Sequence, residues 1–132
     1  MAPRYFTLAE ANAALEELRP LAEQMVERRR ELVDAQARRA ALGAQVGTNG
    51  GDLTPSDFAD ADDELERAAS SLARCVEQIQ AAGVLVKDLD QGLLDFPSLR
   101  EGEEVLLCWH VGEDEIRYWH GVEEGFAGRK PI

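Results

Sequence analysis

Residues 54–83 read TPSDFADADDELERAASSLARCVEQIQAAG, and this stretch marks both ends of a long helix. Thr54 is a typical N-cap, Pro55 suits the first helical position, and Gly83 suits the left-handed residue that follows a helix. Between them apolar residues recur at alternating intervals of three and four: Phe58, Ala61, Leu65, Ala68, Leu72, Cys75, Ile79 and Ala82. This spacing predicts an amphipathic helix that packs along another helix.

The other helix is predicted upstream. Thr7 and Glu10 have the spacing of a capping box, in which each side chain accepts a hydrogen bond from the backbone N–H of the other residue. Pro20 predicts a kink, because proline lacks a backbone donor and crowds the preceding turn. We therefore expect an antiparallel hairpin over residues 7–82. The apolar residues at helical spacing in its first helix are Leu8, Ala11, Leu15, Leu18, Ala22 and Met25.

The length of this hairpin predicts a homodimer. A first helix from Leu8 to about Leu42 would be roughly 50 Å long at about 1.5 Å per residue, which is more than a domain of this size can bury alone. Its seam is therefore expected to take up a second copy of the chain. Opposite charges four residues apart predict ion pairs on the outer faces: Asp34 with Arg38, and Asp63 with Arg67.

The chain changes character after Gly83. Eighteen of the nineteen alanines precede this glycine, and five of the eight aromatic residues follow it. Short apolar runs separated by glycines predict strands at residues 84–86, 93–97, 105–111 and 116–120, followed by an extended tail over residues 121–132. The sequence thus predicts a single α+β domain over residues 1–132, with a small, mostly antiparallel sheet in residues 84–132.

Composition narrows the class of protein. The 132 residues carry 14 basic and 26 acidic groups, a formal charge of −12, so nucleic acid is a poor candidate as a partner. The arginines at 28–30 lie between acidic neighbours and are expected to form ion pairs on a solvated face. No apolar run is long enough to cross a membrane. Cys75 and Cys108 form no CxxC pair and are expected to be reduced thiols, which predicts a cytoplasmic protein.

No recognised catalytic motif is present: GxSxG, HExxH, GxGxxG and CxxC are all missing. Candidate site residues therefore come from polar groups in the predicted sheet. Asp95 lies between Leu94 and Phe96, where partial burial would disfavour its charge and suit it to acid or base chemistry. The alternative is that Asp95 only accepts backbone hydrogen bonds at the turn before Pro97.

The register of the hairpin around Gly112 decides whether a metal site can form. If Val111 pairs with Ile116, His120 lies on the face opposite Cys108. If a bulge at Gly112 shifts the register, Cys108 shares one face with His120. The pairs in that second register are His110 with Ile116, Cys108 with Tyr118, and Leu106 with His120.

In the second register a divalent metal is the cofactor that the residues allow. Cys108, His110 and His120 would be candidate ligands, and Glu115 or water could supply the fourth. The simpler alternative is a structural Cys108 with half-exposed histidines.

Several short strings carry a family resemblance. In combination they resemble the small prokaryotic family known as domain of unknown function 2203, over nearly the whole chain. The resemblance implies no reaction, substrate or cofactor. Its strings are YFTL at 5–8, GLLDFP at 92–97, LCW at 107–109, WH at 119–120 and GFAGR at 125–129. Its polar positions are Asp88, Asp95, Cys108, Glu113, His120 and Arg129; His110 and Glu115 lie outside its pattern.

The resemblance favours a constellation of Asp95, Glu113, His120 and Arg129, in which Arg129 clamps an anion and His120 moves a proton. The alternative is an ion pair between Glu113 and Arg129 that pins the tail to the strand hairpin. Two functions are therefore predicted. One is a cytoplasmic interaction or assembly module that self-associates through its helices and has an unidentified protein partner. The other is a small metal- or anion-binding enzyme of hydrolase or isomerase type.

Overall fold

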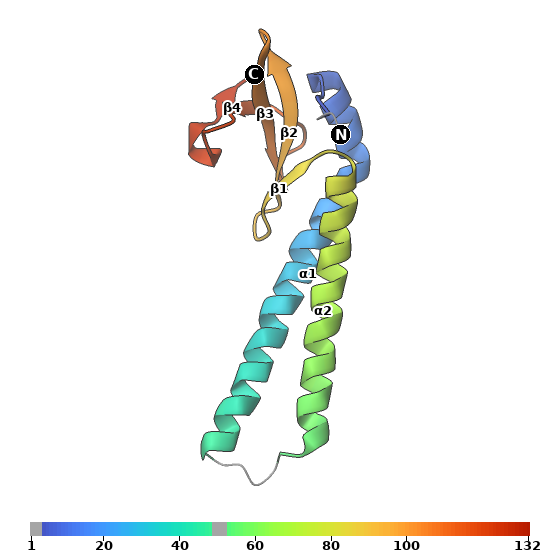
Figure 1. The fold of residues 1–132 in the computed structure, drawn as a ribbon, viewed down its shortest axis with the longest axis vertical. Coiled ribbons are helices and arrows are strands. Elements are labelled where there is room, and N and C mark those ends of the chain that lie inside the picture. The colour runs from blue at the N-terminus through green and yellow to red at the C-terminus, as the bar shows by residue number, and fades with distance from the viewer. Residues whose placement is uncertain (1–3, 49–52) are drawn as a thin grey trace.

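The computed structural model describes residues 4–48 and 53–132. It has the predicted α+β architecture, with two long antiparallel helices followed by a five-stranded antiparallel sheet (Figure 1). Helix α1 spans Leu8–Thr48 and helix α2 spans Pro55–Ala81. The sheet lies beside the N-terminal part of α1 and the C-terminal end of α2, and the rest of the hairpin projects away from it (Figure 1).

The predicted start of α1 and both predicted ends of α2 are confirmed. The backbone N–H of Thr7 donates to Oε1 of Glu10 at 2.9 Å, and the N–H of Glu10 donates to Oγ1 of Thr7 at 3.1 Å. Thr54 caps α2, and Gly83 follows it with a φ of +87°, a left-handed conformation that glycine adopts without strain. Helix α1 runs further than the predicted end near Leu42. It remains one helix through Pro20, and Figure 1 shows its N-terminal part inclined to the rest.

The two helices are joined by charges as well as by their apolar seam. Arg38 pairs with Glu64 and Arg39 pairs with Asp62 at 2.7 Å, so Arg38 bonds across the hairpin rather than to the predicted Asp34. Arg38 and Arg39 pair across the hairpin because α2 presents the acidic side chains of Glu64 and Asp62 to α1. The arginines at 28–30 are all in ion pairs, with Glu31, Asp90 and Glu27 respectively, as expected for a solvated face.

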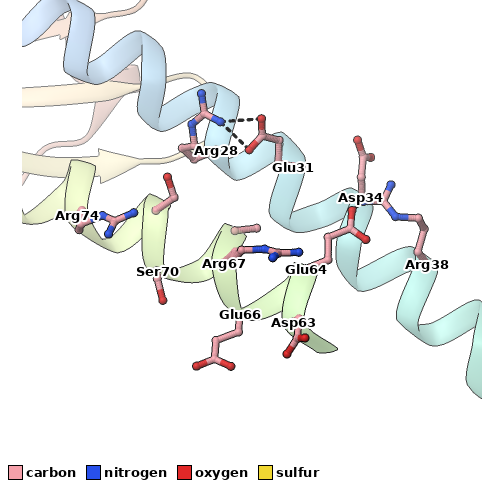
Figure 2. Close-up of a pocket in the computed structure, with 12 residues that line it drawn as sticks. Arg28, Glu31, Asp34, Arg38, Asp63, Glu64, Glu66, Arg67, Ser70 and Arg74 are labelled. Atoms are coloured by element: carbon pink, nitrogen blue, oxygen red, sulfur yellow. Dashed lines mark hydrogen bonds and ion pairs between the residues drawn. The ribbon is translucent and has the colours of Figure 1, made fainter. Parts of the chain in front are cut away.

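A groove of about 980 Å³ runs between the helices where the hairpin projects (Figure 2). Charged side chains of both signs line it. Within residues 4–48 and 53–132, five of these charged lining side chains form no ion pair with another residue: Asp34, Asp63, Glu66, Arg67 and Arg74. The predicted pair of Asp63 with Arg67 is therefore not formed.

The five strands lie in chain order, each antiparallel to the next. Their bounds are β1 Leu85–Asp88, β2 Leu93–Arg100, β3 Glu103–His110, β4 Tyr118–Gly121 and β5 Lys130–Pro131. The predicted tail is only partly extended, because a 3-10 turn at Phe126–Gly128 returns the chain to β4. Strand β4 begins two residues later than predicted, since Ile116 is drawn into the core and its N–H donates to Oδ1 of Asn12 at 2.9 Å.

The hydrophobic core lies between the helices and one face of the sheet. Leu94 and Phe96 of β2 and Leu107 and Trp109 of β3 point into it, where they join apolar residues of α1 and α2. The N-terminal segment closes one edge, with the Phe6 ring 5.5 Å from the Phe96 ring, centre to centre. Residues at alternating positions of the same strands therefore point to the sheet's outer face, away from the helices.

Candidate metal centre

Three buried side chains from three neighbouring strands meet on the outer face of the sheet. Asp95 of β2 is directly opposite Cys108 of β3, and His120 of β4 is opposite Leu106, two residues along β3 from Cys108. The carboxylate, thiol and imidazole ligand atoms all lie within 4.8 Å of one another. Asp95 is 1% exposed, Cys108 0% and His120 2%. This set, Asp95, Cys108 and His120, is called the sheet cluster below.

The register that brings Cys108 and His120 together is the bulged alternative. Cys108 pairs with Tyr118 and Leu106 pairs with His120, as the second predicted register requires. The third expected pair, His110 with Ile116, is not formed, because β4 starts at Tyr118. The connection begins at Gly112, whose φ of +107° lets the chain turn without strain.

His120 is held by a hydrogen bond on each ring nitrogen. Nδ1 lies 2.8 Å from the carbonyl O of Gly121, and Nε2 lies 3.1 Å from Oδ1 of Asp95. A carbonyl oxygen only accepts hydrogen bonds, so Nδ1 carries the proton, and Nε2 is directed at the Asp95 carboxylate. The backbone therefore fixes the tautomer as well as the orientation of the ring.

Cys108 is a protonated thiol in this setting. Burial raises the pKa of its thiol to about 12, and the nearby negative charge of Asp95 acts in the same direction. The positive charge of Arg129 opposes both. A thiol in this state is a poor nucleophile, because the thiolate is the reactive form.

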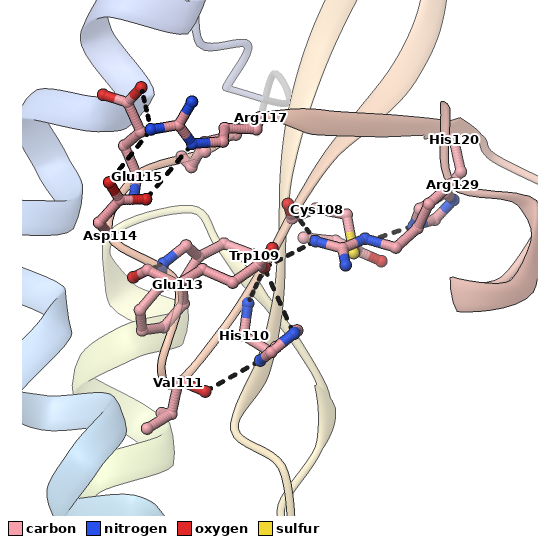
Figure 3. Close-up of polar contacts among 12 residues, drawn as sticks. Cys108, Trp109, His110, Val111, Glu113, Asp114, Glu115, Arg117, His120 and Arg129 are labelled. Atoms are coloured by element: carbon pink, nitrogen blue, oxygen red, sulfur yellow. Dashed lines mark hydrogen bonds and ion pairs between the residues drawn. The ribbon is translucent and has the colours of Figure 1, made fainter. Parts of the chain in front are cut away.

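Glu113 and Arg129 lie beside the sheet cluster and are paired with each other (Figure 3). Nη2 of Arg129 donates to Oε1 of Glu113 at 2.6 Å and to the carbonyl O of Cys108 at 3.3 Å. The same carboxylate accepts the backbone N–H of His110 at 2.9 Å. This is the ion pair predicted as the alternative to an anion clamp, and it ties the C-terminal segment to the turn after β3.

The other predicted site residues lie outside the sheet cluster. Nδ1 of His110 is 2.9 Å from the carbonyl O of Val111, and its Nε2 is 3.7 Å from Oε1 of Glu113. Glu115 forms an exposed ion pair with Arg117 at 3.2 Å. Asp88 accepts the backbone N–H of Gln91 in the turn after β1. Neither His110 nor Glu115 is therefore among the three grouped ligand atoms.

Asp95 is a catalytic candidate from the sequence, but the sequence alone does not join it to Cys108. The pairing of β2 with β3 makes that connection, because it places the two residues opposite each other. One signal was available, since the order Leu94, Asp95, Phe96 sets a carboxylate in an apolar strand. A carboxylate is buried in a protein only where ion-pair or hydrogen-bond partners replace the water that it loses.

The chain is thus an α+β protein in which a helical hairpin supports a sheet with a buried Asp, Cys and His. It belongs to the family described as Uncharacterized conserved protein (DUF2203), whose model matches residues 4–132. No curated protein and no solved structure matches it. In the part of the chain that the structure describes, neither helix combines the length and apolar character needed to cross a membrane.

Proposed function

We propose that this protein binds a divalent transition metal ion through Asp95, Cys108 and His120. The observation that carries the proposal is the grouping of three different ligand atoms within 4.8 Å in a buried part of the sheet. Zn²⁺ accepts sulfur, imidazole nitrogen and carboxylate oxygen together, whereas Mg²⁺ and Ca²⁺ prefer oxygen alone. Three protein ligands leave one position of a tetrahedral zinc site for water or another ligand.

The hydrogen bond from Nδ1 of His120 to the Gly121 carbonyl supports the same function. In metal sites the ligating histidine donates its second N–H to a carbonyl or carboxylate, which aims the other nitrogen at the ion. Nε2 of His120 is aimed at Oδ1 of Asp95, 3.1 Å away. A cation bound to both atoms, such as a metal ion, would stabilise this arrangement.

Metal titration of the purified, reduced protein tests the proposal. Zn²⁺ affinity is measured by competition with a coloured chelator, and Co²⁺ serves as a second probe because a cobalt–thiolate bond has its own absorption band. We expect one equivalent to bind, with the cobalt–thiolate band lost in Cys108→Ser and kept in the matched control Cys75→Ser. His110→Asn is the matched control for His120→Asn. Wild-type protein that binds neither ion, or equal binding by Cys108→Ser, would overturn the proposal.

Self-association through the helices is a second candidate function. The observation that favours it is the groove of the projecting hairpin, where Asp34 and Asp63 face solvent together with Arg67 and Arg74, none of them in an ion pair within the described residues. Unpaired charges of both signs on one surface are complementary to the same surface of a second copy. Sedimentation at micromolar concentration tests it, and a monomer there would contradict it.

The alternative predicted from the sequence, an enzyme of hydrolase or isomerase type, remains a prediction, because a metal ion by itself does not define a reaction. A protein partner of another kind also remains a prediction. A cytoplasmic location is part of the proposal, since Cys75 and Cys108 are both free thiols and Cys108 must stay reduced to bind a metal.

A further inference from the structure

The segment between β4 and β5, residues 122–129, lies over the outer face of the sheet at the sheet cluster. The guanidinium of Arg129 is 4.2 Å from the centre of the Tyr118 ring, and Tyr118 pairs with Cys108. The Phe126 ring is 5.9 Å from the His110 ring, centre to centre. Figure 1 shows this segment on the side of the sheet away from the helices. It therefore lies on the same face of the sheet as the sheet cluster.

This segment is held by few contacts. Val122 is 52% exposed, Phe126 is 42% exposed, and no residue of the 3-10 turn is buried. Glu124 ties the segment to its own ends, by accepting the N–H of Gly121 at 2.8 Å and pairing with Lys130 at 2.6 Å. Segments with few buried apolar contacts open locally without unfolding the rest of the protein.

The Glu113–Arg129 ion pair connects the segment to the turn after β3, and the same guanidinium donates to the carbonyl O of Cys108 at 3.3 Å. Arg129 and Glu113 are 2.6 Å apart with 13% and 15% of their side chains exposed. Nε of Arg129 is buried and has no hydrogen-bond partner within the described residues, so this contact leaves one donor unsatisfied. Glu113 is held in place, because its backbone carbonyl accepts hydrogen bonds from the side chains of Arg19 at 2.8 Å and Trp109 at 3.0 Å.

We propose that residues 122–129 are a gate over the metal site and that the Glu113–Arg129 ion pair is its latch. The inference rests on the proposed metal binding. Cys108 is 0% exposed and His120 is 2% exposed, so an ion reaches them only when their cover moves. Residues 122–129 supply that cover: their 3-10 turn buries no residue, and the Glu113–Arg129 ion pair is the latch. Opening of the gate sets the rate at which metal enters and leaves, and the ligands themselves set the affinity.

The latch is tested with Glu113→Gln, and Glu115→Gln is the matched control because it makes the same change of charge in an exposed ion pair two residues away. The first readout needs no metal: a small thiol reagent labels Cys108 in a Cys75→Ser background. The second is the rate at which excess chelator removes Co²⁺. We expect both rates to rise about tenfold in Glu113→Gln, with little change in Glu115→Gln.

Arg129→Gln, which breaks the same ion pair from the other side, should reproduce the effect and serves if Glu113→Gln folds poorly. Melting temperatures near that of the wild type show that labelling reports local opening. Unchanged labelling and unchanged metal release in both latch variants would overturn the gate even if metal binds. Wild-type protein that binds no metal would overturn the proposed function and the inference with it, whereas faster labelling alone would then show only that the segment opens.

Discussion

Nε2 of His120 and Oδ1 of Asp95 lie 3.1 Å apart where neither side chain is more than 3% exposed. Each side chain is the hydrogen-bond partner of the other, and both are buried. Removing one therefore leaves the other buried with an unmet hydrogen bond, which costs more than losing a contact at the surface.

Two substitutions of Asp95 separate its structural part from its part in metal binding. In Asp95→Asn the amide N–H can donate to Nε2 of His120, so we expect the stability to stay close to that of the wild type while Zn²⁺ affinity falls at least about tenfold. Asp95→Ala leaves Nε2 unpaired and should lower the free energy of unfolding by about 1–3 kcal/mol. Urea denaturation and chelator competition measure the two effects. Equal stability of the two variants would contradict this account.

Alkaline pH should destabilise the metal-free protein through Cys108. Burial raises the pKa of its thiol from 9.0 to about 12 in the folded state. Between these values the unfolded chain loses the thiol proton and the folded chain keeps it, so stability falls as pH rises through this window. Urea titrations in EDTA from pH 8 to pH 11, a range around the ordinary thiol pKa, measure this loss of stability. We expect the free energy of unfolding to fall less in Cys108→Ala than in the wild type. Parallel curves would show that the folded thiol ionises normally.

Gly92 and Gly102 offer a matched test of backbone strain against crowding. Their φ values are +66° and +81°, so alanine at either should cost about 1–2 kcal/mol from the left-handed conformation. A Cβ at Gly92 would also lie 2.5 Å from Cγ2 of Val111, whereas nothing lies within 4 Å of a Cβ at Gly102. We therefore expect Gly92→Ala to lower the free energy of unfolding more than Gly102→Ala. Equal losses in urea denaturation would mean that Val111 moves aside without cost.

The self-association proposal makes a prediction about charge reversal. If two copies meet antiparallel along α2, Asp63 of each copy lies near Arg74 of the other. Asp63→Arg should then weaken the dimer in sedimentation experiments, and adding Arg74→Glu in the same chain should restore it. Glu23→Arg, an exposed residue of α1 that does not line the groove, is the control. A double variant no better associated than Asp63→Arg would rule out this arrangement.

The helices could be predicted from sequence because their signals are local. A capping box at Thr7, an N-cap at Thr54 and a glycine at 83 each act within one turn of the helix that they end. The far end of α1 was less predictable. Beyond Leu42 its apolar spacing weakens and Gly43 is typical of the residue after a helix, yet α1 continues through Gly43 to Thr48.

The sheet cluster could be predicted only in part, because it depends on two strand registers at once. The sequence allowed either register after Gly112, and the two differ by one residue, which moves His120 to the other face. The sequence also did not show which strand pairs with Asp95.

Strand β5 could not be predicted. It has only the residues Lys130–Pro131, too few to show an alternation of apolar and polar positions.

The order of the strands has a consequence for the kinetics of folding. Each strand pairs with its neighbour in the chain, so the strand pairings of the sheet close short loops. Proteins of this kind fold faster than those that join distant segments. Long-range contacts include those of the N-terminal segment, where the N–H of Phe6 donates to the carbonyl of Pro97 and Ser98 donates to the carbonyl of Phe6. We expect this segment to dock last.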